Sequence, residues 1–231
     1  MTWIVRQMLI TGALLIFTVL FFEFSHLDLI IQDQLYNFET GKWLLDSAEP
    51  ISKFLFYDGI RVAYILGGLG LTIALVFFGK APPIKAVKQG LVIVCISMYL
   101  IPLMVNILKE NSDIPCPRDL VHYGGDYPHV TILSGYPADF QGEPNVECYP
   151  AGHASGGFAL LSLFFVFKNP RRRRIAITCV LILSWTVGNY KMIIGDHFIS
   201  HTFVTMFLSW LLILFTASFV NPRFRHDETS D

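Results

Sequence analysis

Three stretches that lie far apart in the sequence each hold cationic or imidazole side chains near the end of an apolar run. The residues are Lys109, Arg118, His153, Lys191, His197 and His201. Lysine and arginine neutralise phosphoryl oxygens, and arginine can bind two of them at once. Histidine titrates near neutral pH and acts as a nucleophile or as a general acid without a metal. Together these residue types favour a site that handles phosphate.

The second stretch, 150–157, reads PAGHASGG and leads into an apolar run. We expect a helix to begin there, so that its unpaired N–H groups and positive end face an anion. Gly152, Ala154 and Ser155 are small enough to let a phosphate approach the backbone. In this interpretation His197 attacks phosphorus and His153 protonates the departing oxygen.

The composition indicates that these stretches are positioned by a membrane protein. Hydrophobic residues make up 53% of the 231 residues and charged residues 15%, against roughly 25% charged in an average soluble domain. The net charge of −1 argues against a nucleic-acid binder. A spanning helix needs about 20 mostly apolar residues. Six runs approach this length, at 8–24, 60–79, 90–108, 153–167, 175–194 and 203–220.

We therefore predict an all-α polytopic membrane protein with six transmembrane helices in a single domain, 1–231. The first run could alternatively be a signal peptide, since Arg6 precedes it. Phe21, Phe22, Glu23 and Phe24 stand where a cleavage site would need small residues, so we interpret the run as a retained anchor.

Basic residues predict the orientation, because cytoplasmic connections carry an excess of lysine and arginine. Eleven of the seventeen fall on alternate connections: Arg6, Lys80, Lys85, Lys88, Lys168, Arg171, Arg172, Arg173, Arg174, Arg223 and Arg225. Both termini are then cytoplasmic, and 25–59, 109–150 and 195–201 lie in the periplasm of a bacterium. The run 171–174 has an alternative interpretation as a lipid-headgroup or nucleic-acid patch, but beside a span it is typical of a topology anchor.

Four cysteines divide between the spans and the long external loop. Cys95 and Cys179 lie in apolar runs and are expected to be small core residues. Cys116 and Cys148 lie near the two ends of the loop, where an oxidising compartment favours a disulfide. Such a bridge would contribute about 3 to 4 kcal/mol by the chain-entropy estimate. The alternative is two free thiols.

The first external segment is apolar at helical spacing. Ile31, Leu35 and Phe38 predict an interfacial helix, followed by aromatic residues at Trp43 and 54–57. The segment either covers a lipid tail that enters between spans or seals the bundle.

The three chemical stretches resemble the signature of the type 2 phosphatidic acid phosphatase (PAP2) superfamily, which also includes vanadium haloperoxidases and bacterial nonspecific acid phosphatases. That signature is KxxxxxxRP, PSGH and SRxxxxxHxxxD. Lys109 and Pro117 match the first block, but Cys116 takes the place of its arginine, and Arg118 follows one position after the proline. The second block reads PAGH and ends in His153.

The third block keeps the nucleophile and changes the residues around it. His197 is in register, Tyr190 and Lys191 replace Ser-Arg, and His201 replaces the aspartate. The resemblance implies that this position orients the nucleophilic imidazole, and either His201 or Asp196 would have to do so here. Ser155 would replace the hydroxyl that the second block lacks. Arg118 either takes the role of the family arginine or is an ordinary loop residue.

These observations predict a membrane lipid phosphatase of the bacterial inner membrane that works through a phosphohistidine, without a metal or cofactor. Its substrate would be a polyprenyl diphosphate, phosphatidylglycerol phosphate, phosphatidic acid or lipid A type of phosphate. A phosphotransferase would use the same residues. From another class, a binding or transport protein that captures an anionic lipid would lack turnover because His201 replaces the aspartate. The oligomeric state is left open.

Overall fold

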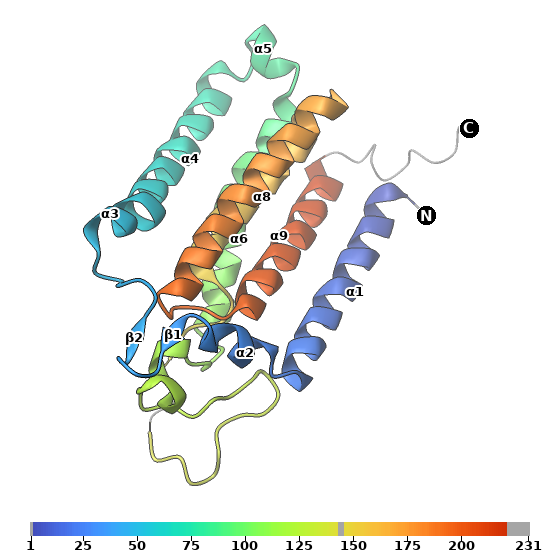
Figure 1. Ribbon diagram of the computed structural model, residues 1–231. Helices are drawn as coiled ribbons and strands as arrows, with labels where there is room; N and C mark the ends of the chain where they lie inside the picture. The colour runs from blue at the N-terminus through green and yellow to red at the C-terminus, as the bar shows by residue number, and fades with distance from the viewer. Residues whose placement is uncertain (1, 143–145, 221–231) are drawn as a thin grey trace.

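The apolar runs form long helices that stand side by side in the computed structural model, which describes residues 2–142 and 146–220 (Figure 1). Within these ranges, five helical segments are long and apolar enough to cross a membrane. Four are single helices, and the fifth is α4 extended at its start by α3 and the π-helical turn η1. The bounds are α1 (Trp3–Phe24), α3 (Pro50–Lys53), η1 (Phe54–Asp58), α4 (Gly59–Phe78), α6 (Lys88–Lys109), α8 (Pro170–Ile193) and α9 (Ile199–Val220). The prediction of an all-α polytopic membrane protein is confirmed.

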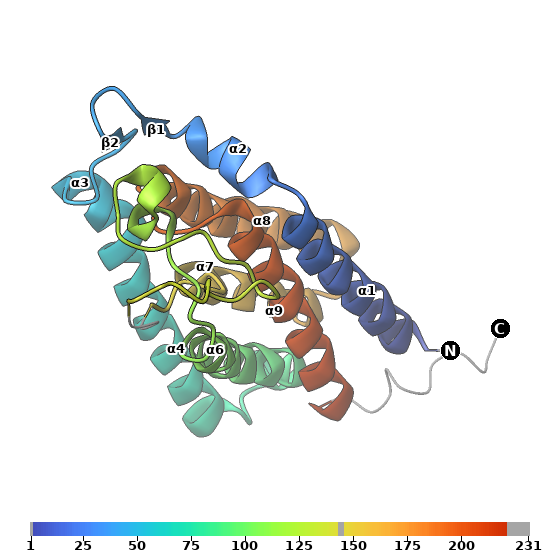
Figure 2. The same ribbon diagram turned by 90° about the horizontal axis from the view of Figure 1, so that it is seen from below.

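The fourth predicted span is a shorter helical segment, α7 (Gly152–Ala159) continued by the 3-10 helix η4 (Leu160–Phe165). The segment packs against α6, α8 and α9, and Figure 2 shows α7 in the middle of the bundle. A Cβ on Gly152 would lie 3.6 Å from Asn106 Oδ1, near the end of α6. A Cβ on Gly90, near the start of α6, would overlap the backbone of Phe165. The segment therefore runs alongside most of α6, over roughly 24 Å from the rise per residue of its two parts.

The basic residues gather at one end of the bundle. The start of α1, the connection between α4 and α6 with α5 (Pro82–Lys85), and the start of α8 all lie at the upper end in Figure 1. These segments carry the basic residues that define the predicted cytoplasmic side, except Arg223 and Arg225, which lie outside the described residues. The opposite end holds the short elements after α1 and α6 and the turn between α8 and α9.

The predicted interfacial helix is shorter than its apolar spacing indicated. Helix α2 (Leu27–Asp33) ends before Leu35, and the chain turns into the hairpin β1 (Tyr36–Asn37) and β2 (Lys42–Trp43). The prediction of a helix through Phe38 is wrong because the Tyr36 ring packs instead on Trp43, with ring centroids 4.8 Å apart. The Tyr36 ring also packs on Tyr123 of the 3-10 turn η3 (Val121–Tyr123), at 5.2 Å. This aromatic cluster covers the turn between α8 and α9.

The core lies between α6, α7 and α9, where Ile101, Phe158 and Ile213 are fully buried. Many apolar side chains on the outer faces of the helices are exposed, for example Leu66 and Phe77 of α4. The apolar surplus of the composition therefore lies on the surface that faces lipid. Cys179 is exposed on α8, so its prediction as a core residue is wrong, whereas Cys95 is half-buried.

A disulfide joins Cys116 to Cys148, with their Cα atoms 5.1 Å apart and a sequence separation of 32. It links the segment after α6 to the segment before α7. Two backbone hydrogen bonds extend this link: Cys148 N–H donates to Ile114 O at 3.0 Å, and Arg118 N–H donates to Gly195 O at 3.0 Å. The long loop is thereby fastened at its base to the turn between α8 and α9.

Removing the disulfide should lower stability. We expect the double variant Cys116→Ser/Cys148→Ser to lose about 3 to 4 kcal/mol of unfolding free energy, because the unfolded chain regains the entropy of the open loop. Thermal unfolding in detergent, with a thiol count before and after reduction, measures this. Cys179→Ser is the control and should change nothing. An unfolding midpoint that reduction leaves unchanged would contradict the prediction.

A side chain at Gly195 should destabilise the folded protein. Its φ is +78°, and an added Cβ would overlap the ring of Trp43. Gly135 also has a positive φ, +58°, but an added Cβ there meets nothing within 4 Å. We expect Gly135→Ala to cost about 1 kcal/mol for its backbone conformation and Gly195→Ala about 1 to 3 kcal/mol more because of the overlap. Equal unfolding midpoints for the two variants would show that Trp43 can move away.

Candidate active site

The structure brings the histidines of the second and third stretches together at the end of the bundle opposite the basic residues. His153 lies in the first turn of α7, His197 in the turn between α8 and α9, and His201 in the first turn of α9. The ring centroids of His153 and His197 are 6.2 Å apart, and those of His197 and His201 are 5.6 Å apart. His197 is thus a neighbour of both other imidazoles.

Asp196 holds two of the predicted phosphate-binding cations. One carboxylate oxygen of Asp196 accepts a hydrogen bond from Lys191 Nζ at 2.7 Å, and the other accepts one from Arg118 Nη1 at 2.5 Å. The Lys191 side chain is only 7% exposed, whereas that of Arg118 is 49% exposed. Both carboxylate oxygens are engaged in these ion pairs. The structure therefore gives Asp196 the role of ordering Lys191 and Arg118, and it shows no hydrogen bond from the carboxylate to His197.

Tyr57 connects the cationic side of this arrangement to His153. Lys191 Nζ lies 4.5 Å from the centroid of the Tyr57 ring, a cation–π contact. The ring centroids of Tyr57 and His153 are 4.8 Å apart. Tyr57 belongs to the π-helical turn η1, and the sequence analysis treated it only as part of an aromatic segment.

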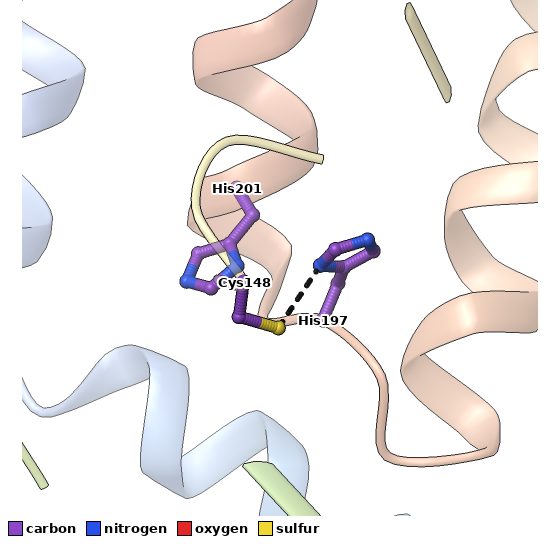
Figure 3. Close-up of side chains that lie close together, drawn as sticks. All are labelled: Cys148, His197 and His201. Carbon is purple, nitrogen blue, oxygen red and sulfur yellow. Dashed lines mark hydrogen bonds between the residues drawn. The ribbon is translucent and has the colours of Figure 1, made fainter. Parts of the chain in front are cut away.

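The disulfide sulfur of Cys148 packs against His197, with 3.5 Å between Cys148 Sγ and His197 Nδ1 (Figure 3). A disulfide sulfur carries no proton, so only Nδ1 can supply a hydrogen to this contact. With the proton on Nδ1, the lone pair of the neutral ring is on Nε2. The contact therefore favours the tautomer in which Nε2 carries the free lone pair.

Burial keeps His197 uncharged. The residue is 3% exposed. Burial lowers its pKa well below the usual value, and positive charge on His201, His153, Lys191 and Lys109 lowers the pKa further. The imidazole is therefore neutral at pH 7, which is the state that a nitrogen nucleophile needs.

His201 is buried next to this group without a hydrogen bond between the two rings. Its Nδ1 has no hydrogen-bond partner among the residues that the structure describes. The ring packs edge-on against Tyr149, with centroids 5.0 Å apart. Figure 3 shows His201 projecting from α9 toward Cys148 and His197. Of the two residues considered for orienting His197, neither makes a direct hydrogen bond to it in the described chain.

One cluster has the residue types of a metal site. The potential ligand atoms of Cys148, His197 and His201 all lie within 4.8 Å of one another. Cysteine binds a metal as a thiolate, but the sulfur of Cys148 is bonded to Cys116. The three residues do not fit a metal ion while this disulfide is in place.

A groove of about 440 Å³ opens beside His153, between α4 on one side and α6 and α7 on the other. Its polar side chains are Tyr57, Arg61, Tyr64, Asn106, Lys109, His153 and Ser155. Its apolar side chains are Phe56, Ile60, Ile65, Pro102 and Val187. The lining contains no carboxylate. A groove with this lining fits a ligand that has an anionic head and an apolar tail.

The small residues of the second stretch divide between the groove and the core. Gly152 begins α7 and lines the groove, and no side chain caps the first turn of this helix. Ala154 is buried in the hydrophobic core and does not line the groove. Ser155 lines it, but its hydroxyl donates to Gly152 O at 2.6 Å. Backbone N–H groups rather than the Ser155 hydroxyl are therefore the donors that α7 offers to an anion.

Arg61 is the lining residue that the sequence analysis missed. It is the only charged residue of α4 and lies near the start of the second apolar run. An ionisable residue inside a spanning segment is itself a signal of function, so the sequence did contain an indication.

Comparison with known proteins gives the family. None of the curated proteins and none of the solved structures that were compared with the chain matches it. The family model described as PAP2 superfamily matches residues 90–225, more than half of the chain. The matched region contains the histidines and the cations Lys109, Arg118 and Lys191. The chain therefore belongs to the PAP2 superfamily, and this membership indicates phosphatase activity.

Proposed function

We propose that the protein is a metal-independent phosphatase that removes phosphate from a membrane lipid phosphate or diphosphate through a phosphohistidine on His197. The observation that carries this proposal is the state of His197, which is buried, uncharged and 6.2 Å from His153 between ring centroids. Its Nδ1 is turned to the disulfide sulfur, so that Nε2 is the free nitrogen.

In the first step, Nε2 of His197 attacks phosphorus and the bond from phosphorus to the leaving oxygen breaks. His153, which takes up a proton when the anionic substrate binds beside it, transfers this proton to that oxygen, so the lipid leaves as a neutral alcohol or as a monophosphate. Lys109, Lys191 and Arg118 neutralise the charge on the other phosphoryl oxygens. The N–H groups at the start of α7 act on the same oxygens.

In the second step, water attacks the phosphohistidine. His153, which gave up its proton in the first step, takes one from the water, and the bond between Nε2 and phosphorus breaks. The products are inorganic phosphate and the enzyme in its starting state. No group other than water is consumed.

Substrate binding has to change the ion pairs of Asp196. The carboxylate of Asp196 accepts hydrogen bonds from both Lys191 and Arg118. A phosphoryl group presents oxygens of the same kind and carries more negative charge, so we expect it to share or displace this carboxylate. Arg118 is half exposed and can turn toward the ligand with little repacking.

The lining of the groove supports a lipid substrate. Its apolar side chains lie next to Arg61, Lys109 and His153, and α4 exposes further apolar residues on its outer face. A polyprenyl diphosphate, phosphatidylglycerol phosphate, phosphatidic acid or lipid A type of phosphate would keep its tails in the bilayer while its head reaches the histidines. We place the protein in the bacterial inner membrane, with both termini cytoplasmic and the site facing the periplasm, on the distribution of basic residues.

Two other functions use the same residues. A phosphotransferase would pass the phosphoryl group from His197 to a second lipid instead of water. A non-catalytic anionic-lipid binding protein is favoured by one observation, that His201 replaces the family aspartate and makes no hydrogen bond to His197. In our proposal the Cys148 contact takes over the orientation of His197, without the negative charge that a carboxylate would add.

Phosphate release from a panel of detergent-solubilised lipid phosphates tests the function. We expect His197→Ala to lose more than about 1000-fold of the rate because the nucleophile is gone, and His153→Ala to lose about 100- to 10,000-fold because proton transfer is lost. His26→Ala removes an exposed histidine that does not line the groove, and it should keep the wild-type rate. A wild type that releases no more phosphate than His197→Ala would show a binding protein. Loss of activity in EDTA would contradict the metal-free chemistry.

A further inference from the structure

Arg61 occupies an unusual position for a charged side chain. It is the only charged residue in α4 (Gly59–Phe78), a helix whose other residues are apolar or small apart from Tyr64 and Thr72. A charged side chain in a spanning segment is costly, and it is typically directed at a partner or a ligand. Arg61 lines the groove beside His153, and no carboxylate lines the groove with it. The structure shows no salt bridge from Arg61 to any residue in 2–142 or 146–220.

The charges in the groove are unbalanced. Arg61 and Lys109 both line it, no aspartate or glutamate does, and neither cation forms an ion pair with a described residue. The cations on the other side of His153 are different, because Lys191 and Arg118 share the carboxylate of Asp196. The lining of the groove therefore holds two cations and no negative charge, next to five apolar side chains, and an anionic group is the ligand that would balance the cations.

Arg61 lies on the side of the leaving group. His153 lines the groove together with Arg61, whereas His197 does not line it. In an in-line displacement the leaving oxygen departs on the side opposite the nucleophile, next to the acid that protonates it. The part of the substrate that follows the leaving oxygen would then enter the groove. In a lipid monophosphate that part is carbon, but in a lipid diphosphate it is a second phosphorus with its charged oxygens.

We propose that Arg61 forms a second phosphoryl subsite next to Lys109, and that the substrate is a lipid diphosphate rather than a lipid monophosphate. This inference rests on the proposed function and narrows its substrate class. Arginine suits the role because its planar fork binds two phosphoryl oxygens at once and its charge persists in an apolar setting. Tyr57 adds a hydroxyl group to the same wall of the groove, whereas the Tyr64 hydroxyl donates to Met98 O at 2.7 Å.

The reaction balances without any further reactant. Nε2 of His197 bonds to the terminal phosphorus, the bond to the bridging oxygen breaks, and His153 protonates that oxygen. Arg61 holds the lipid monophosphate that leaves. Water then releases inorganic phosphate from His197 and returns a proton to His153. The sum is one lipid diphosphate and one water giving one lipid monophosphate and one phosphate.

Turnover of two lipids with the same tail tests the subsite. Polyprenyl diphosphate and polyprenyl monophosphate are compared in non-ionic detergent free of phospholipid, so that a second phosphate comes only from the added compound. For Arg61→Ala we expect kcat/KM to fall about 10- to 100-fold on the diphosphate and less than about threefold on the monophosphate, because one charge-assisted contact is lost on the first lipid only. Arg61→Lys should recover part of the loss.

Lys53→Ala is the matched control. It removes one positive charge from an exposed position of α3, eight residues before Arg61, and Lys53 does not line the groove. We expect Lys53→Ala to leave both rates unchanged. Equal losses on the two lipids for Arg61→Ala, or the same selective loss for Lys53→Ala, would overturn the subsite.

A binding measurement keeps the test independent of turnover. The probes are inorganic pyrophosphate and inorganic phosphate, and the readout is the shift of the thermal unfolding midpoint. We expect the wild type to bind pyrophosphate at least about tenfold more tightly than phosphate, and Arg61→Ala to bind the two with similar affinity. A preference for pyrophosphate that survives in Arg61→Ala would overturn the subsite. Wild type that shows this preference but hydrolyses neither lipid would instead overturn the proposed phosphatase function and leave the subsite standing.

Discussion

The ion pairs of Asp196 are the interaction on which the rest of the site depends. Lys191 and Arg118 come from segments more than seventy residues apart, and one carboxylate holds both, at 2.7 Å and 2.5 Å. A nearly buried lysine without such a partner would be strongly destabilising. The backbone supports the same junction, because Asp196 N–H and His197 N–H both donate to Lys191 O and Arg118 N–H donates to Gly195 O. The turn that carries His197 is thereby fixed relative to the loop after α6. In our proposal a phosphoryl group shares or displaces the carboxylate of Asp196.

Much of the fold could be predicted from the sequence because lipid imposes simple rules. Long apolar runs become helices, and lysine and arginine mark one end of the bundle. The parts that could not be predicted depend on tertiary contacts. The apolar spacing after Ile31 indicated a longer helix, but Tyr36 packs on Trp43 and Tyr123, and the chain forms a hairpin instead. The segment Gly152–Phe165 is surrounded by three helices, so it folds as a short α-helix with a 3-10 continuation rather than as an ordinary span.

For the site, residue types and spacing were enough to place the three histidines and the cations in one region, but not to give their contacts. The sequence offered His201 or Asp196 as the residue that orients His197. The structure instead shows Asp196 bound to two cations and the disulfide sulfur of Cys148 facing Nδ1 of His197. A disulfide predicted for loop closure thus also touches His197, the proposed nucleophile, a contact that no spacing rule indicates. The sequence places Arg61 within an apolar run, but only the groove in the structure shows that Arg61 lies beside His153.

The central claim is that His197 becomes covalently phosphorylated. Rapid quenching of the wild-type protein in alkali during turnover of a lipid phosphate, followed by digestion and mass spectrometry of the peptide around residue 197, tests it most directly. The account predicts a phosphoryl group on His197 that is stable in alkali and released by acid, and that accumulates more in a variant in which water attack is slowed. Phosphate release without any phosphorylated His197 peptide, or a phosphoryl group on another residue, would contradict the account.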